Sequence, residues 1–168
     1  METLQGAANL HPHHKMMRRQ NREITDRVEI DGIIRSERLM RIALVDGDIP
    51  FLVPVFYGFN NTSIYFHSAR AGTKIEILKR NSNVCFEISI DHGVIEDEMA
   101  CDFEARHRTV IGLGKAVFVE DMAEKIEALD LIVAQFSDKK FEYPEANLKR
   151  TMVIRIDIDS IKGKQYGV

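Results

Sequence analysis

Residues 68–74 (SARAGTK) carry the clearest chemical signal in the chain, and it is a signal for binding an anion. The hydroxyls of Ser68 and Thr73 can donate hydrogen bonds, Gly72 allows close approach of the backbone, and Lys74 supplies a full positive charge. A helical pattern begins here, and the start of a helix exposes unpaired N–H groups at the positive end of its dipole. The alternative is an ordinary helix start with a surface lysine, since Ser, Gly and Thr all favour such positions.

His67 directly precedes this turn and is the candidate proton donor. Alternation along a strand places His67 on the same face as Tyr65 and opposite Phe66. Imidazole titrates near working pH, which makes His67 the best proton donor close to the turn. A purely structural histidine is the alternative.

Pro54 interrupts a strand pattern over residues 51–59 (FLVPVFYGF). Proline has no N–H to donate to a neighbouring strand. Either this strand lies at the edge of a sheet, or its hydrogen-bond ladder opens where a flat ligand lies against it. The sequence gives the two readings equal weight.

Three other segments are weaker candidates for a functional site. Cys101 could act as a nucleophile only with a base such as His107, and the sequence spacing does not show that the two meet. The HPHH tract at residues 11–14 could bind a metal ion but has no fixed geometry, so we assign no metal site. Residues 96–98 (EDE) are predicted to form a solvated loop.

Six strands and three helices are predicted to position these residues. The strands are residues 40–45, 51–59, 64–66, 84–90, 108–119 and 151–161, and the second and third are expected to pair as a hairpin. The helices are a short one capped by Thr25-Asp26, then residues 73–79 and 123–136, the last with Ile126, Leu129, Ile132 and Val133 on one side. Gly112 and Gly114 indicate a bulge, a bend or a close backbone approach.

This order of elements predicts a mainly β fold, an antiparallel barrel or sandwich decorated by helices. No GxGxxG follows the first strand and no GxxxxGK[ST] occurs, so the two common nucleotide-binding fingerprints are missing.

Length and composition indicate one domain, with a flexible extension over residues 1–15 and the folded domain over residues 16–168. The net charge of -3 argues against nucleic acid as a partner. The apolar runs are too short to cross a membrane, and the first residues do not form a signal peptide. Two cysteines without CxxC spacing fit a reducing, cytoplasmic location.

The chain resembles the FMN-binding split-barrel superfamily that includes pyridoxamine 5'-phosphate oxidases, and within it the nitroimidazole-resistance (Nim-type) proteins. The resemblance spans about residues 17–164 and rests on five segments in this order: MRRQNREI, RIALVDGDIPFLVPVFYGF, IYFHSARAGTKIEILKRNSNVCFEI, ACDFEARHRTVIGLGKAVFVED and IRIDIDSIKGK.

This resemblance implies a six-stranded antiparallel split β-barrel with peripheral helices, assembled as a homodimer with two FMN sites between the copies. It implies that the turn after the third strand surrounds the FMN phosphate, that residues 53–56 run along the isoalloxazine ring, and that residues 108–110 of the same or the second copy approach from the other side. His67 matches a histidine near the flavin. The implied cofactor-binding residues are Val53, Pro54, Val55, Phe56, His67, Ser68, Ala69, Gly72, Thr73, Lys74, Arg108, Thr109 and Val110.

The chain departs from pyridoxamine phosphate oxidases where these proteins carry basic residues along the second strand. Phe51 and Phe56 occupy that region here, and the C-terminal arginine and histidine pattern is missing. Vitamin B6 oxidation is therefore not expected, and affinity for phosphate must rest on Lys74 and its turn.

The sequence leads to an FMN-dependent oxidoreductase as the first hypothesis. In this hypothesis electrons supplied by NAD(P)H would pass to a small organic acceptor such as a nitro-aromatic compound, with His67 as proton donor. The alternatives are a dimer of the same fold that holds flavin or haem without turnover, and a scaffold dimer with an empty cleft.

Overall fold

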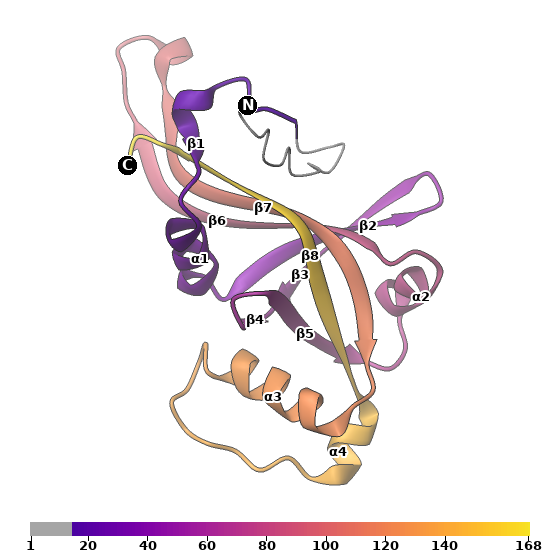
Figure 1. The fold of residues 1–168 in the computed structure, drawn as a ribbon. Coiled ribbons are helices and arrows are strands. Elements are labelled where there is room, and N and C mark those ends of the chain that lie inside the picture. Colours follow the sequence, from indigo (N-terminus) through magenta and orange to yellow (C-terminus); the bar gives the residue numbers. More distant parts are fainter. Residues whose placement is uncertain (1–14) are drawn as a thin grey trace, which may run out of the picture.

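The computed structural model describes residues 15–168, and the described strands form one antiparallel sheet (Figure 1). Their order across the sheet is β3-β2-β6-β7-β8-β5-β4, and β1 pairs with β8 beside this path. The strands are β1 (Glu23–Ile24), β2 (Leu39–Asp46), β3 (Ile49–Phe56), β4 (Gly58–Phe59), β5 (Ser63–Ala69), β6 (Asn83–Ile95), β7 (Glu104–Val119) and β8 (Thr151–Tyr166).

The predicted fold class is confirmed, and the predicted number of strands is wrong. The described chain has eight strands rather than six, because β1 and β4 are two-residue strands with no alternating pattern of their own. The sheet curves like a split barrel but does not close, since β3 and β4 lie at its two ends.

The main core lies inside the curve of the sheet because one side of each long strand is apolar. Met40, Ile42 and Leu44 of β2 are buried there, and so are Phe86 and Ile88 of β6. The alternate residues of these strands face outward. The long strands β6 and β7 also continue past the core as a hairpin arm, which ends in the 3-10 helix η2 (Ala100–Asp102) (Figure 1).

Strand 51–59 breaks at Tyr57, so the predicted hairpin is confirmed only in part. β4 pairs with β5 as predicted, whereas β3 pairs with β2. Tyr57 is fully buried, and its hydroxyl donates to the carbonyl of Ile34 at 2.5 Å, so the chain turns inward at this residue. Pro54 lies on β3, an edge strand, which agrees with the first of its two readings.

Three of the helices cover parts of the sheet. α1 (Arg27–Ser36) begins at Asp26, whose carboxylate accepts a hydrogen bond from the Val28 N–H at 3.0 Å, and it buries three isoleucines. α2 (Thr73–Arg80) follows β5, and α3 (Met122–Val133) packs on the outside of β4 and β5. The remaining helices are η1 (Gln20–Arg22) and α4 (Glu145–Arg150). No helix of residues 15–168 is both long and apolar enough to cross a membrane.

The predicted helix over residues 123–136 exists, and its predicted apolar side is right in part. Ile132 is buried and Leu129 packs against the same cluster, whereas Ile126 is 37% exposed. The helix lies close to Gly58 of β4, where an added Cβ would lie 2.6 Å from the Leu131 Cβ.

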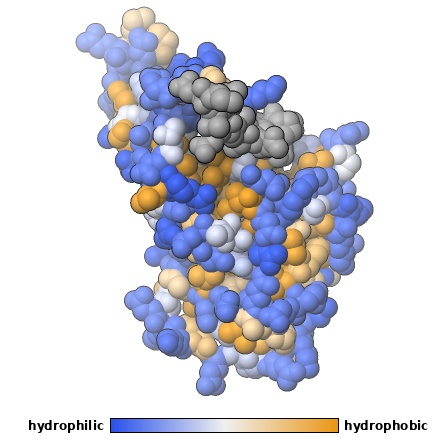
Figure 2. All heavy atoms as spheres, viewed as in Figure 1, coloured by the Kyte–Doolittle hydropathy of each residue, from blue (hydrophilic) through white to orange (hydrophobic). Residues whose placement is uncertain are grey.

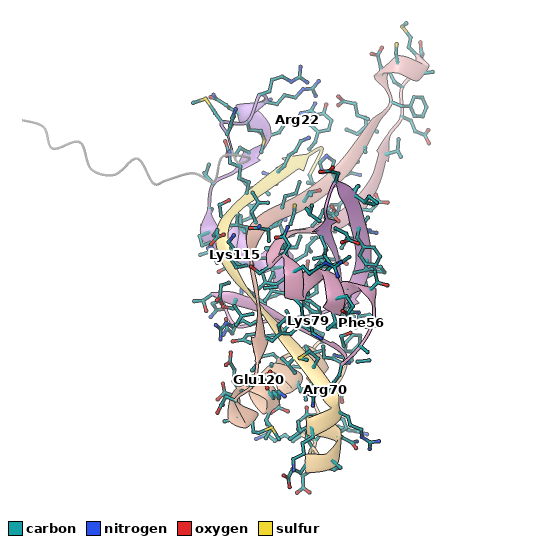
Figure 3. All side chains as sticks on the ribbon, turned by 90° about the vertical axis from the view of Figure 1, so that its right-hand side faces the viewer. Arg22, Phe56, Arg70, Lys79, Lys115 and Glu120 are labelled. Atoms are coloured by element: carbon teal, nitrogen blue, oxygen red, sulfur yellow. The ribbon has the colours of Figure 1, made fainter. Side chains whose placement is uncertain are left out.

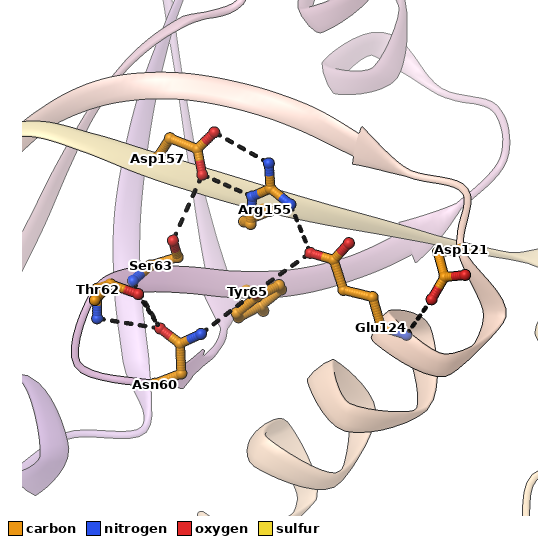
Figure 4. Close-up of polar contacts among 8 residues, drawn as sticks. All are labelled: Asn60, Thr62, Ser63, Tyr65, Asp121, Glu124, Arg155 and Asp157. Atoms are coloured by element: carbon orange, nitrogen blue, oxygen red, sulfur yellow. Dashed lines mark hydrogen bonds and ion pairs between the residues drawn. The ribbon is translucent and has the colours of Figure 1, made fainter.

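A polar cluster attaches α3 to the sheet (Figure 4). Arg155 of β8 forms ion pairs at 2.6 Å with Glu124 of α3 and with Asp157 of its own strand. The Tyr65 hydroxyl donates to Glu124 at 3.4 Å, and these contacts fix the first turn of the helix over β5.

Candidate functional site

A cavity of about 530 Å³ opens where the sheet is split, between β3 and the end of β5. Its size lies within the usual range for small-molecule sites. Two strands and one turn provide its lining. The lining residues are Phe51, Val53, His67, Ser68, Ala69, Ala71, Gly72, Thr73 and Lys74.

The polar end of the cavity is the start of α2. Gly72 is the N-cap residue with φ 130°, a backbone conformation that favours glycine. No side chain caps this helix, in contrast to Asp26 at α1 and Asp121 at α3. The first N–H groups of α2 are therefore available beside the cavity, together with the Thr73 hydroxyl.

Lys74 adds a positive charge to this end. Within residues 15–168 its ammonium group has no ion-pair partner, whereas Lys79 on the same helix pairs with Glu76 at 3.9 Å. Arg70 of the same turn points elsewhere, since it donates to the carbonyl of Lys149 at 2.6 Å, near α4 (Figure 3). Lys74 is thus the cation of this turn that can meet a ligand.

His67 lies between the polar end and the apolar wall of the cavity. Partial burial lowers the pKa of His67 from its ordinary value of 6.5, and the nearby charge of Lys74 lowers it further. At pH 7 the free imidazole is therefore neutral. It can donate one hydrogen bond and accept another, but it serves as an acid only if a bound anion raises its pKa.

β3 forms the apolar wall, and its side chains alternate between the inner and the outer face of the sheet. Phe51 and Val53 line the cavity, and Val55 of the same face is buried in the core. Pro54 and Phe56 lie on the outer face, and Figure 3 labels Phe56. The Phe56 ring meets Phe136 edge to face, with the ring centroids 5.0 Å apart. Of residues 53–56, only Val53 lines the cavity of its own chain.

The structure does not bring residues 108–110 to this cavity within one chain. Arg108 faces Glu29 of α1 at 3.9 Å, and Val110 is buried in the core. Thr109 points to the outer face and contacts Ser89 across the strands at 2.9 Å. An approach to the flavin from a second copy remains a prediction.

The residues of the predicted turn and His67 line one cavity, together with Phe51 and Ala71, which were not predicted, and the binding of a cofactor by them stays a prediction. The period-two pattern of β3 could have identified Phe51, because it shares a face with Val53. The HPHH tract and the predicted extension, apart from Lys15, lie outside the described residues. Within residues 15–168 no group of three or more His, Cys, Asp and Glu side chains could hold a metal ion.

These residues fit the two ends of a flavin nucleotide. Uncapped N–H groups, two hydroxyls and Lys74 suit a phosphate, and Phe51 and Val53 suit a flat aromatic ring. The geometry of the cavity fits a ligand in which an anionic group is joined to a flat apolar ring.

The chain is similar in sequence and in structure to known proteins. The family model described as pyridoxamine 5'-phosphate oxidase matches residues 26–165. A candidate 5-nitroimidazole antibiotic resistance protein from Bacteroides thetaiotaomicron is similar in structure, with 32% sequence identity, a TM-score of 0.76 and coverage of 84% of this chain and 85% of that chain. No curated protein matches the chain in sequence.

Two more distant structures share the fold. The flavocytochrome Anf3 from Azotobacter vinelandii has a TM-score of 0.83 at 20% identity, covering 94% of this chain and 75% of that chain. The FAD and heme binding protein from Mycobacterium smegmatis has a TM-score of 0.80 at 18% identity, covering 88% of this chain and 74% of that chain.

Proposed function

The chain belongs to the pyridoxamine 5'-phosphate oxidase-like family, and on this basis we propose that it is an FMN-dependent oxidoreductase that reduces a small organic acceptor such as a nitro-aromatic compound. The observation that carries the proposal is the cavity at the split of the sheet, with an uncapped helix start and Lys74 at one end and Phe51 and Val53 along the other. The similarity to the candidate nitroimidazole resistance protein supports the choice of acceptor.

The residues of the cavity would have distinct roles toward FMN. The N–H groups at the start of α2, Ser68, Thr73 and Lys74 would hold the phosphate. Phe51 and Val53 would exclude water from one side of the ring. Bound FMN would supply the redox chemistry, with NAD(P)H as the proposed electron donor. His67, neutral when free, would hold a hydrogen bond to the flavin and take up a proton once the bound anion raises its pKa.

We further propose that two copies pair through the outer face of β2, β3, β6 and β7. Large apolar side chains are exposed there. Figure 2 shows that apolar residues lie among hydrophilic ones on the surface of the molecule in view. Leu52 is 62% exposed and Phe56 is 50% exposed. A solvated apolar face of this kind is typical of an interface. The exposed members are Leu39, Val45, Leu52, Phe56 and Ile111. A cytoplasmic location is part of the same proposal.

A second candidate function is a dimer that holds flavin or haem without turnover. It is favoured by the names of the two distant neighbours, a flavocytochrome and an FAD and heme binding protein. In this case the same cavity would bind the flavin, and no acceptor would be reduced.

Absorption spectra distinguish the candidates. We expect the purified protein, loaded with FMN under anaerobic conditions, to show flavin bands that NAD(P)H bleaches and a 5-nitroimidazole restores. Flavin bands that neither reagent changes, or a Soret band, would favour the second candidate. A protein that takes up neither FMN nor haem would contradict both.

A further inference from the structure

A row of hydrogen-bonded side chains crosses the outer face of the sheet, away from the cavity. It consists of Glu87 and Ser89 of β6 and Thr109 and His107 of β7, and we call it the outer-face row. The Ser89 hydroxyl contacts a carboxylate oxygen of Glu87. The Ser89 and Thr109 hydroxyls are 2.9 Å apart, and Thr109 lies 3.2 Å from Nδ1 of His107.

The hydrogens in this row can point in only one direction. Glu87 forms an ion pair with Arg41 at 3.2 Å and is therefore a carboxylate, which accepts hydrogen bonds and cannot donate them. Ser89 has one hydrogen and must give it to Glu87. Thr109 must then donate to Ser89.

The direction of these bonds determines the tautomer of His107. Because the single hydroxyl hydrogen of Thr109 is committed to Ser89, Thr109 can only accept from the imidazole. Nδ1 of His107 must therefore carry a hydrogen. In a neutral imidazole the other nitrogen, Nε2, is then an unprotonated acceptor.

We propose that His107 is a second proton-transfer residue of the flavin site, held as the Nδ1–H tautomer by the outer-face row so that Nε2 can accept a hydrogen bond or a proton from an N–H or O–H group of the ligand. Glu87, Ser89 and Thr109 are positioning residues that act through His107. This inference rests on the proposed function, because the outer face meets a flavin only if two copies pair with the cofactor between them.

The surroundings of His107 leave its ring available at the surface of one chain. The imidazole is half-buried, with Asp91 opposite on β6 and Tyr166 opposite on β8. Arg22 lies over the Tyr166 ring at 3.4 Å and pairs with Glu104 at 3.2 Å. No hydrogen bond to Nε2 competes with a ligand among these described neighbours.

The tautomer can be measured without any flavin. We expect long-range ¹H–¹⁵N spectra of the protein near pH 8 to show His107 as Nδ1–H, with its signals assigned by their loss in His107→Gln, since the chain has six histidines. Thr109→Val removes the hydroxyl at nearly constant shape and should shift His107 to Nε2–H. Thr109→Ser keeps the hydroxyl and should retain Nδ1–H. An Nε2–H tautomer in the unsubstituted protein, or no response to Thr109→Val, would overturn the inference.

The role of His107 toward the flavin is tested with the FMN-loaded protein. With FMN bound and reduced by light with EDTA as the electron donor, His107→Gln should slow reoxidation by a 5-nitroimidazole at least about tenfold, since positioned proton transfer commonly contributes a hundredfold or more. Normal FMN binding with an unchanged rate would overturn the role of His107 and leave the proposed function intact. Failure to bind FMN, with the Nδ1–H tautomer present, would instead refute the proposed function together with the flavin role.

Discussion

Lys74 provides the most direct test of whether the cavity binds a phosphate group. If the start of α2 holds a phosphate, Lys74→Ala removes a charge-assisted contact that contributes roughly 1.5–3 kcal/mol. FMN affinity should fall by roughly ten- to a hundredfold. Riboflavin, which has no phosphate, should bind almost as before. Fluorescence titrations with the two flavins measure the difference.

Lys79→Ala is the matched control for this substitution. Lys79 lies on the same helix but pairs with Glu76 and does not line the cavity. Its removal should leave the affinity for both flavins unchanged. Equal losses of FMN and riboflavin in Lys74→Ala would mean that Lys74 supports the site generally and that the phosphate binds elsewhere.

His67 should report on the charge of Lys74 through its own titration. Burial lowers the pKa of His67 first and Lys74 lowers it second. Lys74→Met should therefore raise the pKa towards 6.5 without reaching it, because the burial remains. NMR titration of the imidazole C–H signals measures the shift, and an unchanged pKa would show that the two side chains do not interact.

The sign of the effect on stability follows from the same shift. The unfolded chain binds a proton at His67 more readily than the folded chain. Stability is therefore lost as pH falls from about 6.5 towards the lower pKa of the folded state, and above pH 6.5 His67 has no such effect.

Ser68, Thr73 and Lys74 are close in sequence, so a single turn brings them together and their common position was predictable. The predicted ring contacts along residues 53–56 form a continuous segment, whereas side chains of a strand alternate between its two faces. Phe51 lines the cavity for this reason, and Phe56 does not.

Among the elements, β7 depends on a glycine at its bulge. The register between β7 and β8 shifts between Leu113 and Gly114, and a Cβ on Gly114 would lie 2.3 Å from the carbonyl oxygen of Asp157. Gly114→Ala should therefore destabilise the protein by about 1–3 kcal/mol in urea unfolding. In Gly32→Ala on α1 the added Cβ has no atom within 4 Å, and we expect it to stabilise by about 0.5–1 kcal/mol. Equal effects of the two substitutions would contradict this account.

The attachment of α3 can be tested through Glu124. Glu124→Gln weakens the ion pair with Arg155, and both side chains are less than one third exposed. We expect a loss of about 1–2 kcal/mol, between the values for surface pairs and for buried charged hydrogen bonds. Glu127→Gln, on the exposed side of the same helix, should change the midpoint of urea unfolding very little. A loss of the same size in both variants would show that the contact with Arg155 is not what stabilises the helix.

The elements themselves were largely predictable, because alternation and helix caps are local signals. Gly112 and Gly114 were predicted to mark a bulge, a bend or a close backbone approach. Gly114 lies at the bulge beside the backbone of Asp157, whereas the Phe86 ring packs directly over Gly112. The break at Tyr57 could not be read in this way. Tyr57 fits a strand pattern, and the bond that turns it inward goes to Ile34, far away in the sequence.

For the whole molecule, the central expectation is pairing of two copies through the outer face. Leu52→Asp places a charge on that face and should convert the dimer to a folded monomer with weakened FMN binding. Sedimentation velocity measures the mass and circular dichroism confirms the fold. Val28→Asp is the control, since Val28 is 78% exposed on α1. A dimer that survives Leu52→Asp would place the interface elsewhere.

The position of β8 in the sheet has a consequence for how the chain acquires its structure. β5 joins the main sheet only through β8, which comes last of the strands in sequence. During synthesis, β2, β3, β6 and β7 can therefore pair in order. The β4–β5 hairpin cannot join the sheet until β8 has been made. The wall of the cavity that carries His67 is completed only after β8 has been made. Pairing between segments this distant is the slow part of assembling a sheet, so we expect this cavity to be among the last regions of the molecule to form.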